Sequence, residues 1–351
     1  MNSFSDKIIT WYKINKRDLP WRNTKDAYLI WLSEIIMQQT RVEQGMNYYL
    51  SFATSYPTVK HLAKADNDDI MKLWQGLGYY SRARNLHTTA KIINDNYKGK
   101  FPDDYTQILS LKGIGEYTAA AIASFAFDKP HAVVDGNVFR VLARVFGIET
   151  PIDTSQGKKE FYALANQLLN PKHAAMHNQA IMEFGAIQCK PVSPDCSVCP
   201  LNTMCFAFAN RRVAQLPIKA KTTKVRNRYF NYIVLHHSGT TAINKRKAKD
   251  IWTNLYDFPL IETEKELSEQ EFLASPQWKK FIGKHKYSIT SISGIYKHIL
   301  SHQKIYARFL EVNCNVSLEK IIPSSAIIIK ETEIEKYAVP RLIENYLTKK
   351  N

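Results

Sequence analysis

The sequence has no long apolar run and few cysteines. No window approaches the roughly 18 apolar residues of a membrane span, and the first residues lack the apolar segment followed by small residues that marks a signal peptide. No transit peptide and no internal repeat are apparent either. We therefore expect a protein of a reducing compartment, without membrane segments, in which the five cysteines are poor candidates for disulfides and better candidates for metal ligands.

The composition is that of a folded, basic protein. The chain has 351 residues, of which 45% are hydrophobic, which is enough for about two domains with substantial cores. Its 48 Lys and Arg against 32 Asp and Glu leave a net charge of +16. This excess favours a polyanionic partner such as nucleic acid, although a basic soluble protein without such a partner is the alternative.

The hydrophobic pattern changes along the chain. Residues 1–210 repeat apolar positions at helical spacing and predict an all-α domain. Residues 211–228 hold seven basic residues and no acidic one, together with Pro217, and we interpret them as a linker. Residues 229–351 predict a smaller α+β domain. Its expected strands lie within 229–239, 251–261, 286–302 and 304–312, and a helix is expected over 334–349.

Four cysteines form a tight cluster in the sequence. Cys189, Cys196, Cys199 and Cys205 follow the pattern C-x6-C-x2-C-x5-C, and four thiolates can complete the ligand set of a zinc ion or of an iron–sulfur cube. Structural zinc sites usually show two close pairs, whereas only the middle pair is close here, which favours iron–sulfur. Cys314 lies far away in an expected strand and is interpreted as a small buried residue.

A turn with two glycines connects two helical segments. The first segment ends at Lys112, Gly113 and Gly115 form the turn, and an Ala-rich helix begins near Glu116. Glycines allow the backbone to approach a phosphate closely, and the free amides of the second helix attract negative charge. Alternatively, Gly113 only caps the preceding helix.

Two carboxylates stand in unusual places. Glu34 lies in a segment that is apolar nearly all round, where burial would raise its pKa to the range of a general acid, or where an unseen Arg or Lys pairs with it. Asp135 follows an apolar run and precedes a helix, where it is either an N-cap or a carboxylate that stabilises positive charge on a sugar. Two carboxylates in different environments are what cleavage of a glycosidic bond requires.

Six motifs occur in a characteristic order. They are LPWR at 19–22, WLSEIIMQQT at 31–40, LWQGLGYYSRARNLH at 73–87, LKGIG at 111–115, VDGNV at 134–138 and the four cysteines. Together they closely resemble the adenine DNA glycosylases of the MutY family, within the helix-hairpin-helix glycosylase superfamily. The resemblance implies an all-α helix-hairpin-helix domain with one 4Fe-4S cluster, followed by a smaller α+β Nudix-like (MutT-like) domain.

The resemblance also implies roles for individual residues in the helical domain. Glu34 would protonate the imidazole edge of a flipped adenine, and Asp135 would stabilise the oxocarbenium-like sugar. The residues expected to line the adenine pocket are Arg22, Tyr117, Asn137 and Gln179. Related bifunctional glycosylase-lyases carry a lysine at the position of Tyr117, so we expect little or no strand cleavage.

Other residues match positions that contact DNA. Gln39 and Tyr79 match residues that wedge into the base stack, while Thr40 and Leu77 match residues near the base opposite adenine. As alternatives, Tyr79 is a core residue and Gln39 a solvated helix end. In the second domain, Leu300, Ser301 and His302 stand where many family members carry Phe-Ser-His in a lesion-reading loop, or they form an ordinary strand and turn. The clustered glutamates of Nudix hydrolases are missing, so we expect no nucleotide hydrolysis.

These observations predict a monofunctional DNA glycosylase. It would act as a monomer on double-stranded DNA with adenine opposite 8-oxoguanine or guanine, in the cytoplasm of a prokaryote. Two rival interpretations are a glycosylase-lyase for oxidised pyrimidines and a metal-dependent DNA-binding protein without catalysis.

Overall fold

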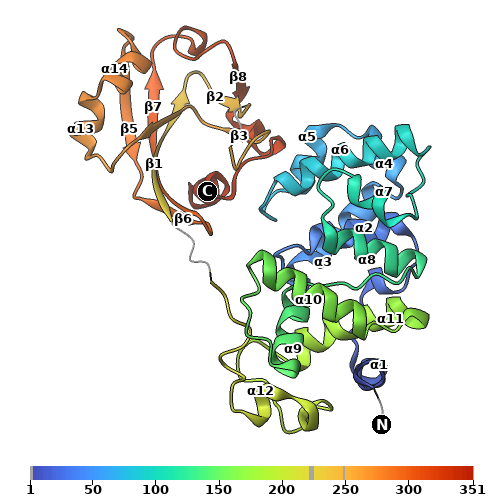
Figure 1. Ribbon diagram of the computed structural model, residues 1–351. Coiled ribbons are helices and arrows are strands. Elements are labelled where there is room, and N and C mark those ends of the chain that lie inside the picture. Colours follow the sequence, from blue (N-terminus) through green and yellow to red (C-terminus); the bar gives the residue numbers. More distant parts are fainter. Residues whose placement is uncertain (1–2, 221–224, 248–249, 351) are drawn as a thin grey trace. The chain divides into compact units, whose positions relative to one another are not determined.

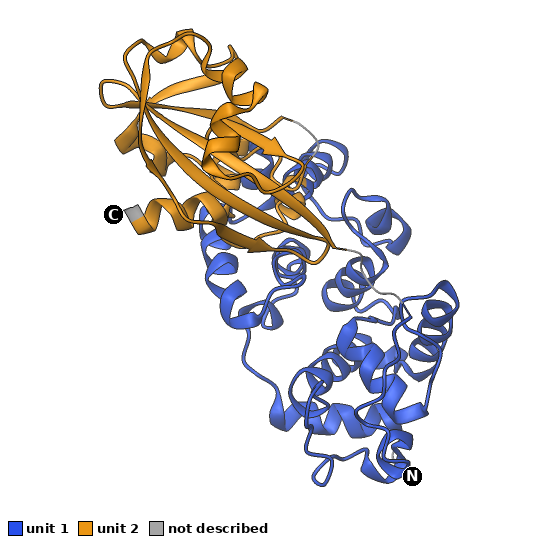
Figure 2. Ribbon diagram, turned by 90° about the vertical axis from the view of Figure 1, so that its left-hand side faces the viewer, with its two compact units in different colours: residues 1–64, 85–222 blue, residues 65–84, 223–351 orange. Residues whose placement is uncertain are grey.

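The computed structural model describes residues 3–220, 225–247 and 250–350 and divides the chain into two compact units (Figures 1 and 2). Unit 1 comprises residues 1–64 and 85–222, and unit 2 comprises residues 65–84 and 223–351. Residues 65–84 therefore belong to unit 2, although they lie within the helical part of the sequence. None of the helices in the described ranges combines the length and the apolar character that a membrane span requires.

Unit 1 is built of helices. Its longer helices are α1 (Phe4–Asn15), α2 (Ala27–Ile36), α3 (Val42–Ser55), α4 (Val59–Lys64), α7 (Tyr105–Ser110), α8 (Glu116–Phe127), α9 (Gly136–Phe146), α10 (Ser155–Leu168) and α11 (Ala174–Glu183). Helix α6 (Ser81–Asn96) begins in unit 2 and continues into unit 1. The π-helical turn η3 (Phe184–Gln188) leads into the cysteine loop, which ends at the short helix α12 (Phe206–Ala209).

Helix α8 lies at the centre of unit 1, because its small residues allow neighbours to approach closely. It packs against α2, α7 and α11. Seven consecutive residues of this helix, Thr118–Ser124, are fully buried. The structure confirms the all-α fold expected for this part of the sequence.

Unit 2 combines two sheets with short helices. The first sheet has the order β4 (Leu260–Thr263), β1 (Arg226–His236), β7 (Gln303–Cys314) and β5 (Tyr287–Ile292), and β6 (Tyr296–Ile299) also pairs with β7. Strands β1 and β7 are parallel, while their other pairings are antiparallel. The second sheet has the order β3 (Tyr256–Asp257), β2 (Thr240–Lys245) and β8 (Ala326–Lys330).

Unit 2 also contains helices. They are α5 (Asn67–Leu73), α13 (Glu269–Ala274), α14 (Pro276–Ile282) and α15 (Arg341–Lys350). Phe272 and Trp278 from α13 and α14 are fully buried against Leu235 and Leu310 of β1 and β7. This α+β architecture is the one expected from the aromatic and β-branched segments.

Several local expectations differ from the structure. Strands β2 and β8 and helices α13 and α14 are not foreseen, because they are short and half exposed and their patterns resemble those of loops. The expected helix over 334–349 is shorter, since α15 begins at Arg341 after Pro340. Strand β1 begins at Arg226, inside the expected linker 211–228, of which residues 221–224 lie outside the described residues. Cys314 is buried in β7, as expected.

Candidate active site

Glu34 is buried in helix α2, which is apolar nearly all round. Asp26 begins this helix by accepting a 2.8 Å hydrogen bond from the amide of Tyr28. Nine of the ten helix residues are buried, and Glu34 is only 8% exposed. A carboxylate in this environment is costly to ionise unless a partner compensates it.

The hydrogen-bond partner of Glu34 is the phenol of Tyr117, while Arg22 acts on the carboxylate through its charge. Tyr117 lies in the first turn of α8, and its hydroxyl donates a 2.6 Å hydrogen bond to Oε2 of Glu34. Burial raises the pKa of Glu34 to about 7, and the charge of Asp135 acts in the same direction, whereas the hydrogen bond from Tyr117 opposes the rise. Glu34 can therefore hold a proton near neutral pH, as a general acid must.

Asp135 is the N-cap of helix α9 and lies close enough to influence Glu34. Its Oδ1 accepts hydrogen bonds of 2.9 and 2.8 Å from the amides of Asn137 and Val138. Its Oδ2 accepts a 2.8 Å hydrogen bond from the side-chain amide of Asn137. Burial raises the pKa of Asp135, although these donors favour the charged form. The capping role is thus present, and the carboxylate still acts electrostatically on the Glu34–Tyr117 pair.

Asn137 is held in turn by Arg140. Nη2 of Arg140 donates hydrogen bonds of 2.9 Å to Oδ1 of Asn137 and 2.7 Å to the carbonyl of Gly185. Its Nε donates a 2.8 Å hydrogen bond to the carbonyl of Cys189. A buried guanidinium therefore connects the Asp135–Asn137 turn to the start of the cysteine loop.

Arg22 is oriented by a buried carboxylate from helix α11. Nη2 of Arg22 and Nη2 of Arg17 each lie 2.7 Å from Oε2 of Glu183, which is 1% exposed. Burial alone would raise the pKa of Glu183, but hydrogen bonds from both arginines lower it to about 2. Gln179, one turn earlier, accepts a 2.8 Å hydrogen bond from the hydroxyl of Tyr12.

Three of the expected adenine-pocket and catalytic residues line one small cavity. Arg22, Glu34 and Gln179 face it together with Trp21, Ile30, Ser33, Phe125 and Met182. Its volume is about 40 Å³, which suffices for water but not for a purine. Tyr117 and Asn137 do not line this cavity. Tyr117 is hydrogen-bonded to Glu34, which lines it, and Asn137 is hydrogen-bonded to Asp135.

The two glycines of the hairpin have different structural roles. Gly113 has a φ of 77°, and a Cβ at this position would collide with the side chain of Asn85. Gly115 is the N-cap of α8, and a Cβ there would meet no atom within 4 Å. The turn thus requires a glycine at position 113, because a side chain would be strained and would collide there. At Gly115 the missing side chain leaves open space near the free amides that begin α8.

The four cysteines that lie close together in the sequence, Cys189, Cys196, Cys199 and Cys205, are all free and half-buried. Nη1 of Arg144 lies 3.4 Å from the sulfur of Cys189, and the sulfur of Cys205 lies 3.4 Å from the carbonyl of Arg144. Burial and the neighbouring thiols raise the pKa of Cys199 to about 11. Within the part of the chain that the structure describes, no three His, Cys, Asp or Glu side chains are close enough to hold a single metal ion.

The residues expected to contact the base stack differ in exposure. Gln39 has a φ of 55° just after α2 and is exposed, and Thr40 Oγ1 donates a 3.2 Å hydrogen bond to the carbonyl of Gln38. In unit 2, Tyr79 is 47% exposed, so it is not a core residue. Leu77, two residues earlier, is only 5% exposed.

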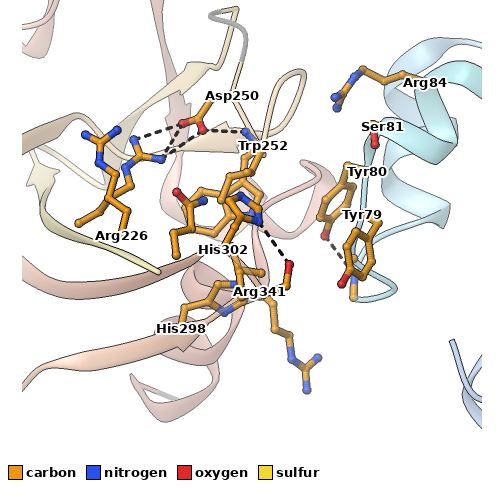
Figure 3. A pocket seen from close by; sticks show the side chains of 17 residues that line it. Tyr79, Tyr80, Ser81, Arg84, Arg226, Asp250, Trp252, His298, His302 and Arg341 are labelled. Atoms are coloured by element: carbon orange, nitrogen blue, oxygen red, sulfur yellow. Dashed lines mark hydrogen bonds and ion pairs between the residues drawn. The ribbon is translucent and has the colours of Figure 1, made fainter. Parts of the chain in front are cut away.

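Unit 2 contains a larger cavity with a volume of about 950 Å³ (Figure 3). Tyr79, Leu300, Ser301 and His302 all line it, so the structure brings together residues that are more than 200 positions apart in the sequence. Trp252 and His298 form another part of its wall, with ring centroids 5.6 Å apart. Arg84, Arg226, Arg228 and Arg341 also line the cavity.

Comparisons with known proteins identify the family of the chain. Residues 32–171 match the family described as HhH-GPD superfamily base excision DNA repair protein, and residues 231–349 match the NUDIX domain. The chain is 33% identical over 308 residues to the adenine DNA glycosylase of Buchnera aphidicola subsp. Baizongia pistaciae, with 86% of this chain and 84% of the relative covered. The chain belongs to the adenine DNA glycosylase family.

Further similarities support the assignment to the adenine DNA glycosylase family. The enzyme of Buchnera aphidicola subsp. Schizaphis graminum is 36% identical over 262 residues, covering 74% of this chain and 75% of the relative. The solved structure of a thermostable thymine-DNA glycosylase is 31% identical with a TM-score of 0.55, covering 59% of this chain and 95% of that chain. As a member of this family, the chain is a DNA glycosylase of base excision repair.

Two positioning residues lie outside the motifs that carry the family resemblance. Glu183 follows an ordinary helical pattern, and Arg140 is one of two basic residues in α9. The sequence near Glu183 gives one sign of a special role, which is that this acidic residue ends a mostly buried helix. Its partners Arg17 and Arg22 are more than 160 positions away in the sequence, so the pairing is visible only in the fold.

Proposed function

We propose that the chain hydrolyses the N-glycosidic bond of adenine paired with 8-oxoguanine or guanine in double-stranded DNA. The observation that carries this proposal is the buried Glu34, with a pKa of about 7, hydrogen-bonded to Tyr117 and influenced by Asp135. A protonated acid beside a second carboxylate is suited to a leaving group that must be protonated while its sugar becomes positively charged. The adenine specificity follows from the family to which the chain belongs.

Each residue of the site has its own role in the hydrolysis of the N-glycosidic bond. Adenine must leave the base stack, because its glycosidic bond is unreachable inside a duplex. Glu34 donates its proton to the imidazole edge of the base as the bond between C1′ and N9 breaks and the electron pair moves to N9. Asp135 stabilises the positive sugar, water adds a hydroxyl group to C1′, and the proton released from water returns to a carboxylate. Arg22, Asn137 and Gln179 orient the base.

Tyr117 limits the reaction to hydrolysis. Burial raises the pKa of its phenol well above the usual value, so it remains protonated and bound to Glu34. A phenol has no amine with which to form a Schiff base at C1′. Borohydride treatment during the reaction should therefore trap no covalent adduct with DNA. A stable adduct would instead favour the rival glycosylase-lyase.

Exposed residues on both units would contact the DNA. Gln39 and Tyr79 are exposed at turns with positive φ, and we assign them to the base stack, with Thr40 beside the base opposite adenine. Leu77 is buried, so it acts there only if its turn rearranges or by supporting Tyr79. Gly113 and Gly115 place the first amides of α8 where a phosphate can approach.

The cavity of unit 2 is the proposed site for the 8-oxoguanine side of the mispair. Ser301 Oγ and His302 Nδ1 lie 3.3 Å apart at its edge, and both side chains offer hydrogen bonds to an altered base edge. Leu300 supplies apolar contact in place of an aromatic ring. Ser301→Ala should reduce the preference for 8-oxoguanine over guanine, whereas Ser288→Ala, an exposed control in β5, should leave this preference unchanged.

We also propose that Cys189, Cys196, Cys199 and Cys205 hold one 4Fe-4S cluster. The chemistry of the donors fits, because four free thiols interact electrostatically with one another and lie beside Arg144. The cluster would stabilise this loop and, having four protein ligands, would leave no open position for catalysis.

Purification under anaerobic conditions tests the cluster. A brown protein with broad absorption in the violet and about four irons per chain is expected, and Cys199→Ser should lose both the colour and the iron. A colourless preparation that contains zinc would contradict the assignment.

Adenine release from matched duplexes tests the substrate. Release from A:8-oxoguanine and from A:G should be faster than release from A:T, because the two units recognise the two sides of the mispair. Equal rates on all three duplexes would contradict the proposed recognition of 8-oxoguanine or guanine opposite adenine. We expect the active protein to be a monomer in the cytoplasm of a prokaryote, and sedimentation at working concentration tests the monomer.

A further inference from the structure

Tyr79 lies in a tight turn that is anchored on both sides to the C-terminal part of unit 2. The turn has positive φ at Gly76, Gly78 and Tyr79, with values of 89°, 77° and 48°. The carbonyl of Gly78 accepts hydrogen bonds from Trp74 and Arg82, and the guanidinium of Arg82 lies over the Tyr79 ring at 5.6 Å. A tyrosine with positive φ persists only where its surroundings fix the backbone.

The first anchor lies in helix α5, before the turn. The carboxylate of Asp68 forms an ion pair with Lys245 of β2 and accepts a 2.8 Å hydrogen bond from the hydroxyl of Tyr256 in β3. Burial alone would raise the pKa of Asp68, but the hydrogen bonds from Lys245 and Tyr256 leave it below its usual value. Lys245 also lies 5.4 Å from the centroid of the Tyr256 ring, so the three side chains form one cluster.

A second set of contacts lies at the end of α5. Nζ of Lys72 donates a 3.3 Å hydrogen bond to the carbonyl of Tyr337, and Oε1 of Gln75 accepts a 3.2 Å hydrogen bond from the amide of Val339. The rings of Tyr337 and Tyr256 meet edge to face at 4.8 Å. These contacts hold the chain one residue before Gly76.

The third anchor lies after the turn. Nη1 of Arg84 donates a 2.8 Å hydrogen bond to the carbonyl of Thr253, next to Trp252 in the cavity wall. Figure 3 shows Tyr79, Tyr80 and Arg84 on this segment and Trp252, His298 and His302 on the C-terminal part of the unit. The turn that carries Tyr79 is therefore fixed at both ends by contacts with Lys245, Thr253, Tyr256, Tyr337 and Val339.

We propose that Lys245 and Tyr256 are positioning residues for base removal, and that they act through Asp68 to hold the Tyr79 turn in the conformation that enters DNA. The proposal rests on the proposed function, in which Tyr79 contacts the base stack. It assigns a second task to the C-terminal region, which would both read the lesion and prepare the wedge that distorts the duplex.

The alternative is a contact that contributes only to folding. A partly exposed ion pair by itself contributes little to stability, and the side chains of Lys245 and Asp68 are 32% and 39% exposed. A purely structural contact would thus change little when it is removed. A positioning contact can change the rate more than the stability, because a misplaced group is costly in the transition state.

Lys245→Met tests the proposal, since it keeps the length of the side chain and removes the charge. At saturating full-length protein, single-turnover release of adenine from an A:8-oxoguanine duplex should slow by about 10-fold. The fluorescence change of 2-aminopurine placed beside the mispair should decrease, because it reports the opening of the stack. Lys245→Arg, which keeps the charge, should retain most of both signals.

Two controls separate positioning from other effects. Lys320→Met removes the same charge at an exposed site in unit 2 and should change neither signal. Asp68→Lys combined with Lys245→Glu reverses the ion pair and should recover the release rate to within about 3-fold of the wild type. An unchanged rate in Lys245→Met, an equal loss in Lys320→Met, or no recovery in the reversed pair would each overturn the proposal.

Failure of the positioning role and failure of the proposed function give different results. If the wild-type protein releases no adenine, the substrate assignment fails. If the wild type is active and Lys245→Met is equally active, only the positioning role is contradicted.

Discussion

The hydroxyl of Tyr117 donates a 2.6 Å hydrogen bond to Oε2 of Glu34 inside unit 1. Two opposing effects act on the pKa of Glu34. Burial of Glu34 disfavours its charged form and raises its pKa to about 7, while the phenol stabilises the charged form and limits the rise. The result is an acid that is partly protonated at neutral pH and that can also release its proton.

Tyr117→Phe should shift the pH dependence of adenine release. The variant removes the hydrogen bond that lowers the pKa of Glu34, so the acid remains protonated to higher pH. The alkaline limb of the single-turnover profile, expected near pH 7 in the wild type, should move upward by roughly one pH unit. Tyr105→Phe, which removes a hydroxyl elsewhere in unit 1, is the control and should leave the limb in place. A downward movement would contradict the account.

Glu34→Gln should stabilise the protein at alkaline pH. The pKa of Glu34 rises from 4.5 to about 7 on folding, so its contribution to stability is fully present below pH 4.5 and is lost as the pH rises through 7. Glutamine does not titrate. The variant should therefore gain up to about 3 kcal/mol over the wild type at pH 8 and little at pH 4.5. Thermal unfolding at both pH values measures this difference, and equal differences would contradict a raised pKa.

Asp135→Asn should separate the two tasks of this residue. Asparagine is as good an N-cap as aspartate, so helix α9 and the melting temperature should change little. The variant removes the negative charge that we propose to stabilise the sugar, so single-turnover release should fall by about 100-fold or more. Asp104→Asn alters the N-cap of α7 in the same way and should retain activity. If Asp135→Asn is as active as this control, capping is the only role of Asp135.

Glu183→Gln should weaken the fold around Arg17 and Arg22. Glu183 is 1% exposed and binds Arg17 and Arg22, so neutralising it leaves two partly buried guanidinium groups without their counterion. A loss of about 3 kcal/mol in the free energy of unfolding is expected. Glu149→Gln, at an exposed ion pair with Arg212, is the matched control and should change stability little. Equal effects of the two variants would show that Glu183 has no special role.

The helical fold and the order of the motifs are readable from the sequence, because local spacing carries them. Helix α2 is apolar on nearly all faces, and this local pattern alone is enough to mark Glu34 as a buried acid. Its partner is not readable in this way. Tyr117 lies 83 positions away on α8, and only the packing of α2 against α8 shows that a phenol donates the hydrogen bond to the carboxylate.

The sequence does not reveal which segments make up unit 2. Residues 65–84 follow the helical pattern of their neighbours, yet they belong to the same compact unit as residues 223–351. The contacts responsible, such as Asp68 with Lys245 and Tyr256, join positions more than 170 residues apart. Polar contacts at such separations have no local pattern, so the sequence does not predict the anchoring of the Tyr79 turn.

The central claim is that Glu34 supplies the proton for adenine release. The most direct measurement is single-turnover release from an A:8-oxoguanine duplex by the wild type and by Glu34→Gln, with binding of the same duplex measured for both. The account predicts release by the wild type, loss of release by the variant and retained binding, because glutamine keeps the shape of the side chain but has no carboxylic proton. Full activity of Glu34→Gln would contradict the account.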